Sequence, residues 1–305
     1  MTATEPAPRY GRAVPKEWLV ERIRAAAAEE AALLPVHAAF GVRAVDAQPG
    51  RTAFGQRMGP WLLDRDGRLS PGAFMVAVDA ALGSAVNTAA AEASTVMSLT
   101  IHAQFVTLDP AGARDFTVRA RAGHIGPTSG FSSGEIVDDN GRLIATVSTQ
   151  CGFMRLAAPP ALSSGPVTIA DGDWSVEPAG PGLAPLAERR AGARLVAAAD
   201  GRVTVSARAS ATVRNSRGVV QGGVLALLAE QALSACLVRS SPGLAAADTM
   251  ELDVSYLRAA DADQPDLEIT AHTEHAGRRF GLARATARDG AGRLVLSASG
   301  ARYGG

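Results

Sequence analysis

Lysine, cysteine and aromatic residues are scarce in this chain of 305 residues, and each shortage excludes a class of function. Lys16 is the only lysine, and 30 basic side chains balance 30 acidic ones, so no basic surface for nucleic acid or an anionic membrane is predicted. The two cysteines, Cys151 and Cys236, form neither a metal-spacing motif nor a disulfide framework. They fit a reducing compartment, and we expect a cytoplasmic protein.

Long apolar runs are also missing. Gly, Ser or charged residues interrupt every apolar segment well before the ~18 residues that a membrane span needs, so no membrane association is predicted. The N-terminal stretch 1–18 has no apolar core of a signal peptide. Aromatic residues make up 5% of the chain, which does not suggest a pocket that stacks aryl groups. A hydrophobic fraction of 47% with 20% charged residues instead predicts a globular protein of about two domains.

The chain contains two copies of one unit, offset by 151 residues. At this single shift, identical residues coincide without a gap from about residue 41 to residue 145. Chance agreement in a chain rich in Ala and Gly would scatter over many offsets, so the sequence predicts an internal duplication. The matches include Gly67 with Gly218, His124 with His275, Asp138 with Asp289, and Gly141-Arg142-Leu143 with Gly292-Arg293-Leu294.

A segment rich in Pro, Gly and Ser separates the two copies. This composition is typical of a linker. The sequence therefore predicts an N-terminal segment (1–40) with a leading helix over 18–34, a first domain (41–156), a linker (157–185) and a second domain (186–305).

Both copies predict the same order of secondary structure. A strand (51–57 or 202–208) leads to a long apolar helix (72–91 or 222–239). Alternating strands follow, and the last three are joined by tight turns rich in Asp and Gly, which is typical of a meander. Each unit is thus expected to be α+β, with one long helix packed on an antiparallel sheet.

The start of the second helix carries a spaced motif. It consists of Asn215, a turn with Gly218, the triplet Gln221-Gly222-Gly223, and Glu230 eight residues after Gly222. The motif and its setting resemble the hotdog fold, and within it the acyl-CoA thioesterases of the phenylacetate-degradation type. Those enzymes usually have His where this chain has Gln221. The resemblance implies a double hotdog that hydrolyses the thioester of an acyl-CoA or an acyl-carrier protein, with no metal and no cofactor beyond the substrate's own coenzyme A.

The spacing indicates how such a site is assembled. Eight helical residues span ~12 Å, so Gly222 and Glu230 cannot serve the same carbonyl group. The N–H groups of a first helical turn can stabilise an oxyanion, and a carboxylate can activate water. The carboxylate must then come from an antiparallel helix of the other copy, where Asp79 corresponds to Glu230.

The two crossed sites are predicted to be unequal. Asp64 and Pro71 stand in the first copy where the second has Asn215 and Gly222, and proline has no N–H to donate. We therefore predict one working site with Asp79 as the base and Asn215 and Gly222 on the donor side. The site that contains Glu230 is predicted to be decayed or to serve binding alone.

Weaker candidates complete the predicted site. Ser98 and its counterpart Thr249 occupy the position where the family has a hydroxyl that helps to hold the attacking water. Gln221 and Gly223 are predicted to contact substrate. The resemblance also places Arg278 and Arg279 in a turn where family members carry basic residues near the phosphates of coenzyme A.

Two other functions remain open. Pro71, Asp64 and Gln221 favour a non-catalytic protein that binds acyl thioesters or acts as a scaffold. A hotdog hydratase or dehydratase is the other alternative, although neither Asp79 nor Glu230 has a histidine close by in the sequence. We also expect that double hotdogs can pair into a homodimer, with the monomer as the rival state.

Overall fold

The computed structural model describes residues 16–64, 67–90, 94–155, 191–199, 201–247, 249–260 and 266–304. The linker predicted at 157–185 and most of the N-terminal segment before the first helix lie outside these residues. The first unit contains α1 (Glu17–Ala28), α2 (Pro35–Ala39), β1 (Val42–Gln48), β2 (Arg51–Arg57), η1 (Pro60–Leu62), α3 (Pro71–Ala89), β3 (Ser94–Phe105), β4 (Asp115–Ile125), β5 (Ser129–Asp138) and β6 (Leu143–Arg155). The second unit contains β7 (Ala193–Ala199), β8 (Arg202–Arg208), η3 (Ala211–Val213), α5 (Gly222–Ser240), η4 (Pro242–Ala246), β9 (Thr249–Tyr256), β10 (Asp266–Ala276), β11 (Phe280–Asp289) and β12 (Leu294–Tyr303).

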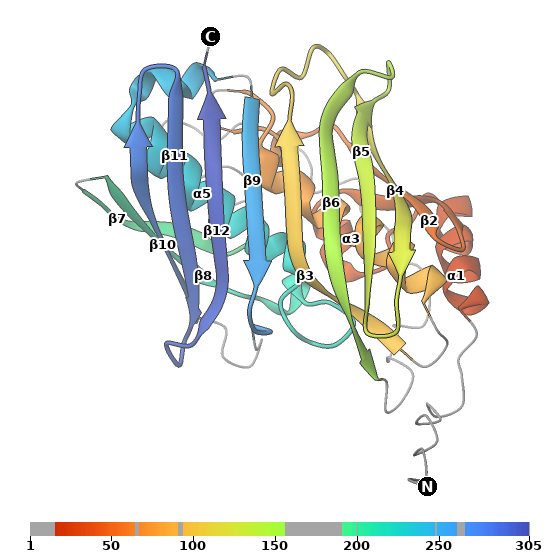
Figure 1. Ribbon diagram of the computed structural model, residues 1–305. Coiled ribbons are helices and arrows are strands. Elements are labelled where there is room, and N and C mark those ends of the chain that lie inside the picture. Colours follow the sequence, from red (N-terminus) through yellow and green to blue (C-terminus); the bar gives the residue numbers. More distant parts are fainter. Residues whose placement is uncertain are drawn as a thin grey trace, which may run out of the picture.

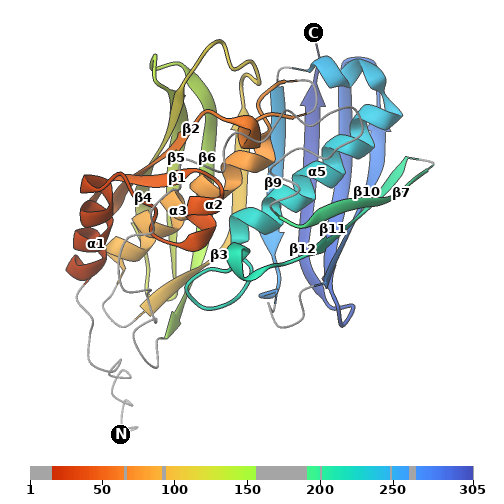
Figure 2. The ribbon, with the colours of Figure 1, turned by 180° about the vertical axis from the view of Figure 1, so that it is seen from behind.

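The strands of both units form one antiparallel sheet. Its twelve strands run in the order β1-β2-β4-β5-β6-β3-β9-β12-β11-β10-β8-β7, so β3 and β9 join the two units edge to edge. At this seam His102 pairs with Asp253, its own equivalent 151 residues later, which places a pseudo-twofold axis at this pair. The helices cover one face of the sheet (Figures 1 and 2). The structure confirms the predicted double hotdog.

The long helices α3 and α5 pack against each other in antiparallel directions. A Cβ atom on Gly223 would lie 2.2 Å from the carbonyl oxygen of Met75, and one on Gly72 would lie 3.1 Å from Cα of Leu227. Glycine at both positions therefore allows the two backbones to approach closely. Both helices are long and apolar enough for a membrane span by length and composition, but most of each lies buried within the fold, as expected for core helices.

The leading helix is shorter than the sequence predicted. α1 ends at Ala28 rather than at 34, and a separate short helix, α2, begins at Pro35. Glu30 adopts a positive φ of 51°, which turns the chain away from the helix axis. This turn buries Ala31 and Leu33 in the core, and that burial outweighs the helix propensity of the segment.

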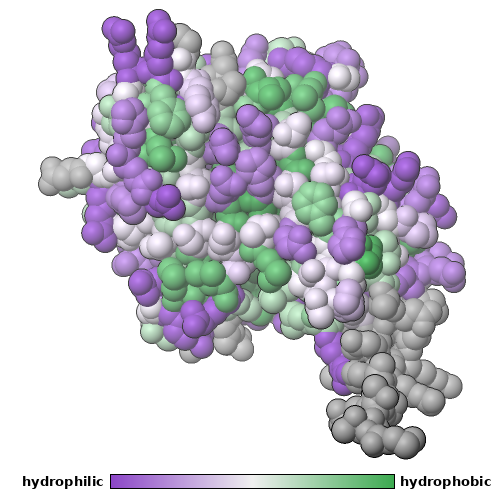
Figure 3. Space-filling view, in the orientation of Figure 1, coloured by the Kyte–Doolittle hydropathy of each residue, from purple (hydrophilic) through white to green (hydrophobic). Residues whose placement is uncertain are grey.

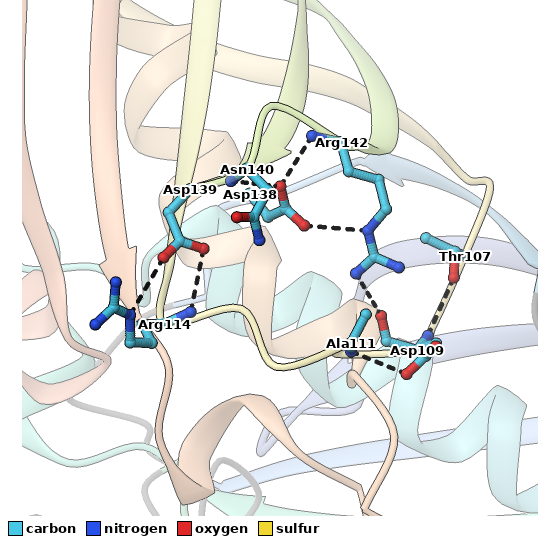
Figure 4. A network of polar contacts seen from close by, with 8 residues as sticks. All are labelled: Thr107, Asp109, Ala111, Arg114, Asp138, Asp139, Asn140 and Arg142. Atoms are coloured by element: carbon cyan, nitrogen blue, oxygen red, sulfur yellow. Dashed lines mark hydrogen bonds and ion pairs between the residues drawn. The ribbon is translucent and has the colours of Figure 1, made fainter.

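The turns of the meander are held by duplicated hydrogen bonds. The Asp138 carboxylate accepts hydrogen bonds from the backbone N–H groups of Asn140 at 2.9 Å and Arg142 at 2.8 Å, and from Nε of Arg142 at 3.1 Å (Figure 4). Burial alone would raise the pKa of Asp138, but these contacts outweigh it and the pKa is lowered. Asp289 repeats this arrangement with Arg293 in the second unit. The shared turn shows that the duplication preserves side-chain contacts as well as backbone.

We expect Gly223→Ala to destabilise the protein, because the added methyl group would overlap the backbone of α3 at Met75. Overpacking of this kind costs about 1–3 kcal/mol in the free energy of unfolding. Gly83→Ala is the matched control, since Gly83 also lies within a core helix but a Cβ there would be 3.9 Å from its nearest neighbour. The control should be neutral or up to about 1 kcal/mol more stable. Urea denaturation followed by circular dichroism measures both, and equal stabilities would contradict the tight helix contact.

Candidate active site

The carboxylate of Asp79 on α3 lies against the first turn of α5. Its Oδ2 accepts a hydrogen bond from the backbone N–H of Gly223 at 3.2 Å. Its Oδ1 accepts a hydrogen bond from the hydroxyl of Ser98, on β3, at 2.7 Å. The acid of one copy thus meets the helix N-terminus of the other, as the spacing of the motif predicts.

Gly222 makes this approach possible. A Cβ atom at this position would lie 3.1 Å from Oδ2 of Asp79, closer than ordinary contact. The hydroxyl of Tyr256 donates a hydrogen bond of 2.8 Å to the carbonyl oxygen of Gly222 and so fixes the first residue of α5. Burial raises the pKa of Tyr256 well above its usual value, which keeps this phenol protonated as a donor.

The environment of Asp79 changes its acidity in two opposing ways. Burial raises the pKa of this carboxyl group and is the largest influence. The Ser98 hydroxyl, the N–H groups of Gly223 and Gly222, and the positive charge of Arg217 all favour the charged form and lower it. The net pKa lies above the usual value for aspartate, so the ionised carboxylate is a stronger base than an exposed one.

A cavity of about 470 Å³ opens beside Asp79, within the size range of small-molecule sites. Both copies contribute to its wall, so the site exists only where the two units meet. Five of the predicted residues line it: Asp79, Ser98, Asn215, Gln221 and Gly222. It is also lined by side chains that the sequence did not single out, among them His37, Asn87, Arg217, Tyr256 and Arg258.

Three of the predicted residues build the site through local contacts. Asn215 uses its Oδ1 to accept a hydrogen bond of 2.9 Å from the N–H of Arg217, which shapes the turn before α5. Gln221 caps α5, because its Oε1 accepts from the N–H of Val224 at 3.2 Å and its Nε2 donates to the Val76 carbonyl at 3.2 Å. The side chain of Gln221 thus joins the two helices. Gly223 packs on the α3 backbone and does not line the cavity.

Three other predicted residues lie away from the cavity. Thr249 begins β9 and pairs with Tyr303, and its side chain lies outside the described part of the structure. Arg278 and Arg279 are exposed on the turn between β10 and β11. This turn lies beside the C-terminal end of α5, where the Ser241 hydroxyl donates to the Gly277 carbonyl at 2.9 Å. The two arginines are therefore on the side of Glu230, away from Asp79.

The equivalent site around Glu230 is enclosed. Glu230 is 1% exposed, and its carboxylate accepts hydrogen bonds from the hydroxyl of Ser234 and from Nε2 of Gln231. Burial raises the pKa of Glu230, while the charge of Arg302 and the Ser234 hydroxyl lower it. Arg302 is 4% exposed and donates from Nη2 to the Ser234 hydroxyl at 3.1 Å. Pro71 starts α3 here, so the N–H that Gly222 offers at the other site is missing.

The residues that distinguish the two sites were missed because the motif does not contain them. Arg217, Tyr256 and Arg302 are all near one of the two acids, and each differs in charge or polarity from its partner in the other copy. At the offset of the duplication they correspond to Asp66, Phe105 and Cys151. A comparison of the two copies for unequal charge and polarity, rather than for identity, would have found them.

A possible metal site lies elsewhere, on the open face of the sheet that Figure 3 views. Ligand atoms of His102, Glu251 and Asp253 lie within 4.8 Å of one another at the seam of the two units. Nδ1 of His102 and Oδ1 of Asp253 are already 2.6 Å apart. Strand alternation turns these side chains away from the helices, so this group does not take part in the cavity beside Asp79.

Family models match both halves of the chain. Residues 15–154 match the acyl-CoA thioesterase C-terminal domain, and residues 217–296 match the thioesterase superfamily. A search of curated protein sequences finds no match.

Solved structures resemble most of the chain. The tesB protein of Mycobacterium avium subs paratuberculosis is 12% identical with a TM-score of 0.57, over 88% of this chain and 98% of that one. The acyl-CoA thioesterase II TesB2 of Mycobacterium marinum is 11% identical with a TM-score of 0.56, over 88% and 98%. A putative thioesterase of Novosphingobium aromaticivorans is 16% identical with a TM-score of 0.54, over 85% and 100%. At these identities the likeness shows the tandem hotdog fold, and the two family models show that each half of the chain is similar to thioesterases.

Proposed function

We propose that the protein hydrolyses an acyl-CoA thioester at the Asp79 cavity. One observation carries this proposal: a partly buried carboxylate lies against the first turn of an opposing helix, at the wall of a cavity of suitable size. A general base and an oxyanion donor within reach of one carbonyl are what this reaction requires. The thioesterase family models on both halves support the same chemistry.

The proposed hydrolysis is a general-base attack of water on the thioester. Asp79 takes a proton from a water molecule, and the water oxygen forms a bond to the thioester carbonyl carbon. The backbone N–H of Gly222 and the dipole of α5 stabilise the oxyanion that develops. The carbon–sulfur bond then breaks, the sulfur takes up the proton from Asp79, and the free acid and coenzyme A leave. Ser98 orients the carboxylate throughout, and no cofactor beyond the substrate's own coenzyme A is needed.

The proposed substrate includes the nucleotide part of coenzyme A. Arg217 and Arg258 both line the cavity and supply the positive charge that its phosphates would need. They take the role that the sequence suggested for Arg278 and Arg279. A thioester of an acyl-carrier protein remains the alternative substrate, and membership of the phenylacetate-degradation type remains a proposal that rests on the motif at Asn215 to Glu230.

We expect Asp79→Asn to lower kcat by at least about 10²-fold, because general-base catalysis is typically worth ~10²–10⁴-fold. Glu230→Gln makes the same chemical change at the equivalent position of α5 and serves as the matched control. Its kcat should stay within a few-fold of the parent, because Glu230 is 1% exposed and lies beside Gly72 at the start of α3, where Pro71 has no N–H to donate. Release of free coenzyme A in steady state, with acyl groups of several lengths, measures both variants.

If Glu230→Gln lowered kcat strongly and Asp79→Asn did not, the working active site would be the one that contains Glu230. Binding of acyl-CoA without turnover of any thioester would support the scaffold function instead. Hydration of an enoyl-CoA without release of coenzyme A would support the hydratase.

The pH profile tests the environment of Asp79. Because its pKa is raised, activity should fall on acidification at a higher pH than an exposed aspartate would give. Ser98→Ala removes a hydrogen bond that favours the charged carboxylate, so it should move the acid limb of kcat/KM to still higher pH. A Ser98→Ala profile that coincides with the parent, or lies at lower pH, would contradict the role assigned to this hydroxyl.

A further inference from the structure

The cavity continues along α3 beyond Asp79 and ends in polar groups. Asp79, Gly83 and Asn87 are spaced four residues apart, so they share one face of the helix, and all three line the cavity. A Cβ on Gly83 would have only Val96 within 4 Å, at 3.9 Å, so the space beside it is open. The helix rises ~12 Å between Asp79 and Asn87. An acyl chain that starts at the carboxylate would run past Gly83 toward the amide of Asn87.

The amide of Asn87 is oriented by Lys16. Nζ of Lys16 donates hydrogen bonds to Oδ1 of Asn87 at 2.8 Å and to the Ser94 carbonyl at 2.5 Å. An ammonium group has donors only, so the oxygen of the amide must face Lys16, and the NH₂ group is left for another partner. Burial lowers the pKa of Lys16 to about 8, which still leaves it mainly protonated at neutral pH. The end of the cavity therefore offers the NH₂ group of Asn87 as a hydrogen-bond donor, with the positive charge of Lys16 next to it.

Among the residues that the structure describes, no carboxylate forms an ion pair with the Lys16 ammonium. His37 lines the same cavity and is 5% exposed, yet its Nδ1 has no hydrogen-bond partner. Burial lowers the pKa of His37 to about 4, so this imidazole is neutral. Buried polar groups are normally paired, and an unpaired one on a cavity wall points to a ligand with polar atoms.

We propose that the acyl group of the substrate carries a carboxylate at its far end, which accepts hydrogen bonds from the Asn87 amide within the field of the Lys16 ammonium. This inference rests on the proposed thioesterase function. Contacts of ~3 Å at each end leave roughly half of the ~12 Å for the carbon chain, which fits an adipoyl group better than a succinyl or a sebacoyl group.

The test compares adipoyl-CoA with hexanoyl-CoA, two substrates of equal carbon number that differ in the terminal carboxylate. We expect the parent protein to prefer adipoyl-CoA in kcat/KM by about 10–100-fold, the range of a charge-assisted hydrogen bond. Asn87→Asp keeps the contact to Lys16 but presents a second carboxylate to the substrate, so the adipoyl-to-hexanoyl ratio should fall by at least that factor. Asn140→Asp makes the same change in an exposed turn and should leave the ratio unaltered.

A failure of this inference and a failure of the proposed function give different results. Release of coenzyme A from hexanoyl-CoA at the same rate as from adipoyl-CoA, with a ratio unmoved by Asn87→Asp, would overturn the carboxylate assignment and leave the thioesterase intact. If neither compound is hydrolysed, the proposed function fails, and calorimetric binding of the same two compounds decides the inference. Tighter binding of adipoyl-CoA that Asn87→Asp abolishes would support it, and equal binding would overturn it.

Discussion

The close approach of α3 and α5 is the contact on which the rest of the structure depends. Gly72 and Gly223 remove the side chains that would hold the two backbones apart. Only at this separation does Asp79 reach the N–H of Gly223, and only then does a cavity form with walls from both units. The shared sheet also fixes how the two units are placed relative to each other, through the pairing of β3 with β9. The site is thus a property of the interface between the copies and of neither copy alone.

The two equivalent acids have diverged through their neighbours. Asp79 faces a cavity with a hydroxyl, two backbone N–H groups and a nearby arginine, which leave it ionisable and accessible. Glu230 is buried with Arg302 and Ser234, which occupy its surroundings as a closed polar cluster. Protein groups supply the hydrogen bonds of this cluster: Ser234 and Gln231 donate to Glu230, and Arg302 donates to Ser234 and to the Leu244 carbonyl. The same position therefore faces a cavity in one site and is packed inside the protein in the other.

The sequence predicted the features that repeat and the differences that lie within the motif, but it missed the differences outside the motif. Identical glycines at a constant offset revealed the duplication, and the eight-residue spacing from Gly222 to Glu230 implied that the acid had to come from the opposite helix. Side chains whose role depends on tertiary contact gave no such signal. Lys16 and Asn87 are 71 residues apart and meet only in the folded chain. Gln221 was predicted to contact substrate, and it does line the cavity, but its capping of α5 and its bond to the α3 backbone were not foreseen. The predicted leading helix was too long, because helix propensity depends on local sequence and does not include the burial of Leu33 in the core.

The pairing of His102 with Asp253 has an evolutionary consequence. In a homodimer of a single ancestral unit, the residue on the twofold axis faces a copy of itself, so two different side chains cannot meet there. Fusion of the two units into one gene released each position to mutate independently, and a hydrogen-bonded pair of different side chains could then arise at the axis. The change also disfavours a return to homodimers of either half. Two first halves would set His102 against His102 and lose this hydrogen bond, and two second halves would set Asp253 against Asp253, where the carboxylates repel. Each half has therefore become specific for the other.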